Sequence, residues 1–358
     1  MRGLAVLVMI ECHTFNSFAR LDIRNGGPYV LSQFVGGMAA PLFLFMAGMT
    51  FGFQMESLER REPNRWRRWV VSLRRAGYIM AIAFAFRITN WIASMPRPEM
   101  AEITKVDILN SMALAMGAFA AASLFEGRNR IRFALIGALA VAAVAPVIES
   151  FSWSGTPQLI VEYLAPGPNR GRFPFFPCAA YIGFGLAAGA IVKQTAERAV
   201  AANMDRLMQW FALIGFVAIF TAQYFADIPS SIYPNPDFWR SSPSLIFIRT
   251  GISLAMLASA YLWTEYGAGT RWSCMQALGK TSLLVYWVHI MLVYGNIVKH
   301  WKRTLSIPET ALAFAIVAAL MVALAAARLA WTDRRKKPKY APPPETTETP
   351  GTLATRTN

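Results

Sequence analysis

The stretch from Met1 to Ala19 reads MRGLAVLVMIECHTFNSFA, and it decides how the rest of the chain is interpreted. It is apolar over the length of one membrane helix, yet Arg2 lies at its start and Glu11 and His13 lie in its middle. At ~1.5 Å of rise per residue, His13 is ~16 Å from Arg2, near the centre of a hydrocarbon layer about 30 Å thick. Ionisable side chains at that depth are costly unless they face a polar cavity or partner groups, so the stretch predicts a functional site. The alternative is a hydrogen-bonded pair that only holds helices together.

The composition indicates an integral membrane protein. Of 358 residues, 55% are hydrophobic and 15% charged, with a mean hydropathy of +0.36, whereas a soluble domain carries about 25% charged residues. The net charge of +15 does not indicate nucleic acid, because the basic residues lie between apolar runs and near the C-terminus. The three cysteines, Cys12, Cys178 and Cys274, show no metal-ligand spacing, and we expect no metal. No small-residue cleavage site follows the first apolar run, so we expect it to be retained rather than removed as a signal peptide.

Hydropathy predicts an all-α polytopic membrane protein with ten transmembrane helices. The predicted spans are 3–19, 30–53, 76–94, 107–125, 131–149, 174–192, 207–226, 244–265, 281–299 and 307–331. They form one transmembrane domain over residues 1–331, followed by a basic, Pro- and Thr-rich cytoplasmic tail at 332–358 that we expect to be disordered. Segments rich in Ala and Gly, such as GFGLAAGA at 183–190, predict close contact between helices.

The distribution of basic residues predicts that both termini are cytoplasmic. The loops after spans two, four, six and eight and the tail carry most of the Lys and Arg residues, and the alternate loops carry about half as many. The outer loops at 151–173 and 227–243 are rich in Trp, Tyr, Pro and Asn. Such residues suit either sugar rings or an aromatic belt at the membrane interface, and the sequence leaves both open.

Under this topology the buried ionisable residues share the central and outer half of the bilayer, so one polar cavity could contain them all. They are Glu11, His13, Arg87, Asp107 with its neighbour Asn110, Arg249, and His289 beside Tyr286. Histidine can accept and return a proton near neutral pH, which makes His13 and His289 candidate bases. A structural ion pair, such as Arg87 with Asp107 or Glu11, is the alternative for the charged members.

Four segments together resemble one family of membrane-bound acyltransferases. They are RGLAVLVMIECHTF at 2–15, APLFLFMAGMTFGF at 40–53, KVDILNSMALAMG at 105–117 and LGKTSLLVYWVHIMLVYG at 278–295. The chain is most similar to the bacterial branch related to heparan-alpha-glucosaminide N-acetyltransferase, and the acyltransferase-3 and glucan-succinylating families share the outline. The resemblance extends over most of residues 2–296.

The resemblance implies an enzyme of the bacterial inner membrane. Its donor would be a cytoplasmic acyl-CoA, usually acetyl-CoA, and its acceptor a carbohydrate hydroxyl or amine on the extracytoplasmic side. The expected partners are therefore acyl-CoA, a glycan or sugar and the lipid bilayer, with no nucleic acid; monomer and homodimer both stay open. Residues that the resemblance and the buried charges together assign to substrate binding are Arg2, Arg87, Asp107, Asn110, Arg249, Ser282 and Tyr286.

The expected mechanism is direct transfer, with His13 as general base, oriented by Glu11. Arg87 or Tyr286 would stabilise the oxyanion, and arginines of the cytoplasmic loops would hold the CoA phosphates. Residues 20–35 lack the additional histidine of the eukaryotic sugar acetyltransferase, so His13 would act alone or with His289.

A proton-coupled transporter of a small polar or sugar-like molecule is the alternative function, although it would more often show an inverted repeat, which this sequence lacks. A structural protein would need fewer buried ionisable groups.

Overall fold

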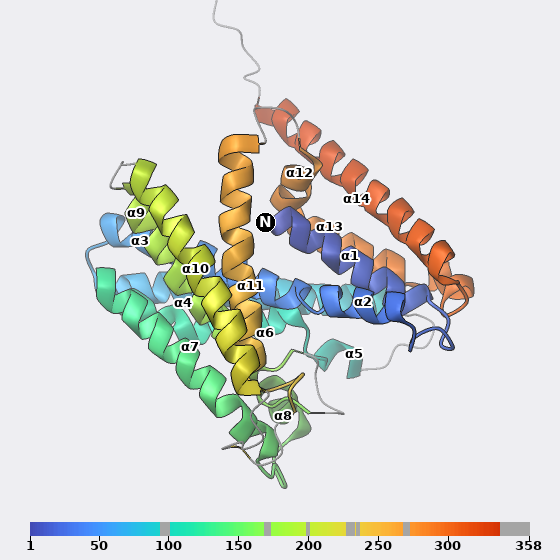
Figure 1. Ribbon diagram of the computed structural model, residues 1–358, viewed down its shortest axis with the longest axis horizontal. Helices are drawn as coiled ribbons and strands as arrows, with labels where there is room; N and C mark the ends of the chain where they lie inside the picture. The colour runs from blue at the N-terminus through green and yellow to red at the C-terminus, as the bar shows by residue number, and fades with distance from the viewer. Residues whose placement is uncertain are drawn as a thin grey trace, which may run out of the picture.

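The computed structural model describes residues 1–93, 101–167, 173–197, 201–226, 233, 237–267 and 273–336. Within these residues the regular structure is helical, apart from one isolated β-bridge between Ala19 and Leu305 (Figure 1). Several sequence predictions fall outside the described residues. These are parts of both outer loops, the tail from residue 337 on, and the basic residues Arg97, Arg170, Arg172, Arg198 and Arg271.

Each predicted span contains a helix at its place, so the all-α fold is confirmed. The corresponding elements are α1 (Arg2–Phe18), α2 (Gly27–Gly36) with α3 (Ala39–Arg61), α4 (Arg65–Ala93), α6 (Ile108–Phe119) with the 3-10 helix η1 (Ala120–Leu124), α7 (Gly127–Ser150), α9 (Phe175–Glu197), α10 (Ala201–Ala226), α11 (Pro243–Leu262) with the π-turn η2 (Trp263–Gly267), α13 (Ser282–Tyr294) with η3 (Asn296–Trp301), and α14 (Ile307–Lys336). Three shorter helices are α5 (Ala101–Thr104), α8 (Gln158–Leu164) and α12 (Cys274–Lys280). Figure 1 shows α1 beside α2, α13 and α14, and it packs against α2, α12, α13 and α14.

The predicted number of ten spans needs correction. Seven helices of the described chain are long and apolar enough to cross a membrane, or eight if α12 and α13, which meet at 89°, form one broken span. The helix α1, with 17 residues, and the segment of α6 with η1, with 12 and 5 residues, fall short, because they extend only ~25 Å and ~28 Å, less than a ~30 Å hydrocarbon layer. Hydropathy identifies apolar segments but not the exact residue at which each helix ends.

The most extensive helix contact joins α3 to α9 through glycines on both helices. A Cβ atom at Gly48 would lie 2.2 Å from the Ile182 carbonyl oxygen, and one at Gly185 would lie 2.0 Å from the Phe45 carbonyl oxygen. Gly48 and Gly52, like Gly185 and Gly189, are four residues apart, as in other close membrane-helix pairs. The predicted close contact of the GFGLAAGA segment is therefore confirmed, and the backbones of α3 and α9 touch without intervening side chains.

A buried ion cluster joins the ends of α3, α7 and α9. Arg130 has no exposed side-chain surface and donates to the carboxylates of Glu56 and Glu59, the latter at 2.6 Å. Gln194 of α9 also donates to Glu56, at 3.1 Å. A guanidinium removed from water is stable only when charged partners surround it, so this cluster fixes three helix ends.

The last helix continues beyond its predicted end. We expected the span to stop at residue 331, but α14 runs to Lys336. The sequence offers no helix breaker until Pro338, and a residue that precedes proline avoids the helical conformation. The first five residues assigned to the tail are therefore helical.

Candidate functional site

Two cavities lie between the helices that carry the family-like segments. The first, of about 470 Å³, is lined by His13 and is called the histidine cavity. The second, of about 520 Å³, is lined by Arg2 and is called the N-terminal cavity, since it lies at the start of α1. Residues that line both cavities are Met9, Phe43, Ile108 and Tyr286, which come from α1, α3, α6 and α13.

The order of lining residues along α1 and α3 shows how the cavities are arranged. On α1, Arg2 lines the N-terminal cavity, Met9 lines both and His13 lines the histidine cavity. On α3 the order is reversed, since Phe43 lines both and Thr50, further along, lines only the N-terminal cavity. The two cavities are therefore stacked along α1, with His13 one helical turn beyond Met9.

The central polar feature of the histidine cavity is a pair of imidazoles. The Nδ1 atom of His13 lies 3.0 Å from Nε2 of His289, and Nδ1 of His289 lies 2.8 Å from the carbonyl oxygen of Val285. His289 is fully buried, whereas His13 is half-buried at the cavity surface. Tyr294 packs edge-on against the His13 ring, with centroids 5.6 Å apart.

This geometry fixes the tautomers of both rings in the neutral pair. A carbonyl oxygen can only accept a hydrogen bond, so Nδ1 of His289 carries the proton and donates to Val285. Nε2 of His289 is then an acceptor, and Nδ1–H of His13 must be its donor. The proton-accepting atom of His13 is consequently Nε2.

Glu11 does not fill its predicted orienting role in this geometry. It lies two residues from His13 on α1, and residues at that spacing point to different faces of a helix. Its carboxylate lies beside Ser32 of α2, and Oε2 is buried without a hydrogen-bond partner among the described residues. His289, rather than Glu11, contacts Nδ1 of His13.

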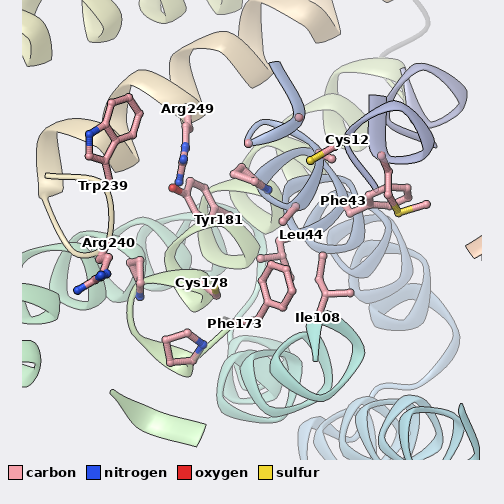
Figure 2. A pocket seen from close by; sticks show the side chains of 18 of the residues that line it. Cys12, Phe43, Leu44, Ile108, Phe173, Cys178, Tyr181, Trp239, Arg240 and Arg249 are labelled. Atoms are coloured by element: carbon pink, nitrogen blue, oxygen red, sulfur yellow. The ribbon is translucent and has the colours of Figure 1, made fainter. Parts of the chain in front are cut away.

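The far side of the histidine cavity is cationic and aromatic. Figure 2 shows the side chains of Arg249 and Tyr181 directed toward each other, so that the guanidinium lies against the phenol hydroxyl. Trp239 and Arg240 lie at the rim, both exposed, and Arg240 pairs with Asp237 at 3.2 Å. Within the described part of the chain, the residues that line this cavity include no Asp or Glu.

Arg87, Asp107 and Asn110 form a neighbouring cluster that lines neither cavity. Asp107 caps α6 by accepting from the backbone N–H of Asn110 at 3.3 Å, and the Asn110 side chain accepts in return from the Asp107 N–H. Asn110 also donates to the Tyr163 hydroxyl at 3.1 Å, and burial raises the pKa of this hydroxyl. Arg87 is buried and close enough to Asp107 to act on it electrostatically. The cluster fixes the start of α6, where Ile108 lines both cavities.

The N-terminal cavity contains two guanidinium groups. Arg2 donates to Thr50 at 3.1 Å, and Arg75 donates to Gln54. The two cations are near enough to repel each other, and the described lining of this cavity includes no acidic side chain. Ser282 lines the same space. The cavity is therefore suited to an anion.

Several lining residues were not singled out by the sequence. They are Gln33, Thr50, Arg75, Tyr181, Trp239 and Arg240. Arg75 is one of seven arginines between residues 60 and 75. Such a basic cluster predicts a cytoplasmic loop, but it does not indicate which arginine lines a cavity. Among the described residues, no group of three His, Cys, Asp or Glu side chains is placed to hold a metal ion.

A comparison with protein families relates the first two thirds of the chain to a known family. The family described as "Heparan-alpha-glucosaminide N-acetyltransferase, catalytic" matches residues 1–229. This range includes the first three of the four segments quoted from the sequence, and the segment with His289 lies beyond it. No curated protein matches the chain.

Proposed function

Because the chain belongs to the heparan-alpha-glucosaminide N-acetyltransferase catalytic family, we propose that it is a membrane acyltransferase. It transfers an acyl group, expected to be acetyl, from acyl-CoA to a carbohydrate hydroxyl or amine. The observation that carries this proposal is the stacking of two cavities, one cationic and one with a histidine pair, separated by four side chains.

The N-terminal cavity is proposed to bind the donor. Arg2 and Arg75 supply the fixed cations that phosphate groups of CoA prefer. The remaining lining is apolar and includes Ile79, Ile82 and Met112, which suits the pantetheine chain. Arg2 lies at the start of α1 and Arg75 in the first half of α4, on the side that the basic-residue distribution predicts to be cytoplasmic, where acyl-CoA is made.

The histidine cavity is proposed to bind the acceptor. It is bounded by segments of the predicted outer loops, including Trp239, so the acceptor would enter from the extracytoplasmic side of a bacterial inner membrane. An indole can pack against the C–H face of a sugar ring, and Arg249 can donate to its oxygen atoms. The donor and acceptor then meet at the boundary of the two cavities.

The histidine pair supports general base catalysis. Nε2 of His13 removes the acceptor proton as the oxygen or nitrogen attacks the thioester carbon; the carbon–sulfur bond then breaks, and the CoA thiolate takes this proton from His13. Throughout, Nδ1–H of His13 donates to Nε2 of His289, which holds the ring in place and stabilises the imidazolium. A base of this kind contributes about 10²–10⁴-fold to the rate.

Of Tyr286 and Arg87, Tyr286 is the better placed to stabilise the oxyanion. It lines both cavities, whereas Arg87 lines neither. Its ring packs against His289 with centroids 5.8 Å apart, so a carbonyl between the cavities lies within reach of its side chain. A donor fixed before the reaction stabilises developing charge at no cost of reorganisation.

The proposal is tested first by ligand binding. Acetyl-CoA should raise the melting temperature of the detergent-purified protein, because a ligand that binds only the native state stabilises it. Desulfo-CoA should give a similar shift and free phosphate a much smaller one. Addition of amino sugars and neutral sugars should then release CoA. No shift with acetyl-, succinyl- or longer acyl-CoA at millimolar concentration would exclude the donor site.

A proton-coupled transporter is the second candidate, because two stacked cavities with a thin boundary also suit alternating access. Counterflow of a labelled sugar in proteoliposomes without acyl-CoA would support this function. Release of CoA that depends on acceptor would support the acyltransferase.

A further inference from the structure

We propose that Met9, Phe43, Ile108 and Tyr286, here called the partition, select the length of the acyl group that is transferred. This inference rests on the proposed function. Each of the four residues comes from a different helix, and each lines both cavities. The two cavities therefore adjoin at these four residues.

The position of the base requires the acyl group to pass the partition. Met9 lies four residues before His13 and seven after Arg2, which corresponds to ~6 Å and ~10 Å along α1. With the CoA phosphates held near Arg2, the thioester carbon must come within ~3 Å of an acceptor atom that also touches Nε2 of His13. The acyl carbons that extend past the carbonyl must fit beside the partition. Each added methylene needs space that a close-packed wall does not offer.

Neighbouring contacts hold two of the four side chains in place. The Tyr286 ring packs on Phe86, which is buried, with centroids 5.1 Å apart. Ile108 follows Asp107 directly, and the capping box of Asp107 with Asn110 fixes the backbone on both sides of it. Met9 is buried in an apolar cluster, and its unbranched side chain changes shape at low cost. Met9 is therefore the member expected to adjust to the acyl group, and Ile108 and Tyr286 are expected to set the width.

The test compares partition residues with matched residues that line only the N-terminal cavity. Ile108→Ala and Met9→Ala are the partition variants, and Ile79→Ala and Met112→Ala are the controls. Each purified variant is assayed for CoA release with acetyl-, propionyl-, butyryl- and hexanoyl-CoA and one acceptor. A pocket typically discriminates one methylene by 10–200-fold. We expect the ratio of butyryl to acetyl transfer to rise about tenfold or more in the partition variants and to stay unchanged in the controls.

The outcomes distinguish the partition from the proposed function. An equal rise in partition and control variants would overturn the inference, because the length limit would then lie in the donor cavity. A wild-type protein that transfers acetyl groups, with partition variants whose chain-length ratio is unchanged, would overturn it as well. A wild-type protein without transfer from any acyl-CoA would refute the proposed function and the partition together. If Ile108→Ala does not fold, Ile108→Val should shift the ratio in the same direction by less.

Discussion

Nδ1 of His13 and Nε2 of His289 lie 3.0 Å apart, although 276 positions of the sequence separate them. The backbone carbonyl of Val285 completes a chain of three groups in which each has a defined donor or acceptor role. The order resembles that of a catalytic triad, with a carbonyl oxygen and a second imidazole in place of a carboxylate. In the neutral pair, Nε2 of His13 is therefore the nitrogen that can accept a proton.

Replacement of His13 by Ala should abolish transfer and leave donor binding intact. Removal of the proton acceptor should lower the rate of CoA release by about 10²–10⁴-fold. The acetyl-CoA melting shift should persist, because His13 does not line the N-terminal cavity. His300→Ala is a suitable control, since His300 is exposed. Activity within a few-fold of wild type would refute the assignment of His13 as the base.

Replacement of His289 should affect kcat without changing the KM for acyl-CoA. His289→Ala removes the acceptor for Nδ1–H of His13, so the ring loses its defined tautomer, and we expect kcat to fall about 10²-fold. His289→Gln keeps an acceptor oxygen and should retain more activity. The pH profile of kcat should change in both variants. A fall in melting temperature with unchanged kcat per folded protein would indicate a purely structural role.

Replacement of Arg75 should weaken donor binding. A charge-assisted hydrogen bond is worth about 1.5–3 kcal/mol, so Arg75→Gln should raise the Kd for acetyl-CoA roughly 10–100-fold. Arg74 is the matched control, because it is exposed and does not line the cavity. Titration calorimetry with acetyl-CoA measures both. Equal losses in the two variants would show that general positive charge, rather than this site, attracts the donor.

The contact of α3 with α9 should not tolerate a methyl group. Gly185→Ala places Cβ 2.0 Å from the Phe45 carbonyl oxygen, and such overpacking costs about 1–3 kcal/mol or more. Gly77→Ala is the control, because nothing lies within 4 Å of its added Cβ and alanine favours the helix. Thermal unfolding in detergent should show a lower melting temperature for the first variant alone. Unchanged stability of Gly185→Ala would mean that the two helices separate without cost.

The buried Arg130 should be required for stability. Arg130→Ala leaves Glu56 and Glu59 without their cation, and loss of one partner of a buried pair costs about 3–5 kcal/mol. Arg128→Ala, at an exposed position in the same segment, should be nearly neutral. Comparison of the two melting temperatures checks this expectation.

The sequence predicted the positions of the long apolar helices because apolar length is a local property, but it did not predict the short helices α5, α8 and α12. It also identified Arg2, His13, Tyr286 and Ser282, all of which line one cavity or the other. The contact of His13 with His289 could not be derived, because neither hydropathy nor periodicity reports which helices pack together. Asp107 and Asn110 illustrate a missed signal. An Asp followed three residues later by Asn at the start of an apolar run is the spacing of a capping box, which explains both residues through the helix terminus.

The glycine contact between α3 and α9 has a mechanical consequence. Two helices whose backbones touch cannot slide past each other without separating, so α3 and α9 should behave as one rigid body. Phe43 and Thr50 are carried on that body. By contrast, α13 meets α1 through long side chains, including the histidine pair itself. A relative motion of the helices is therefore expected to leave α3 and α9 together, and His13 on α1 and His289 on α13 lie outside that rigid body.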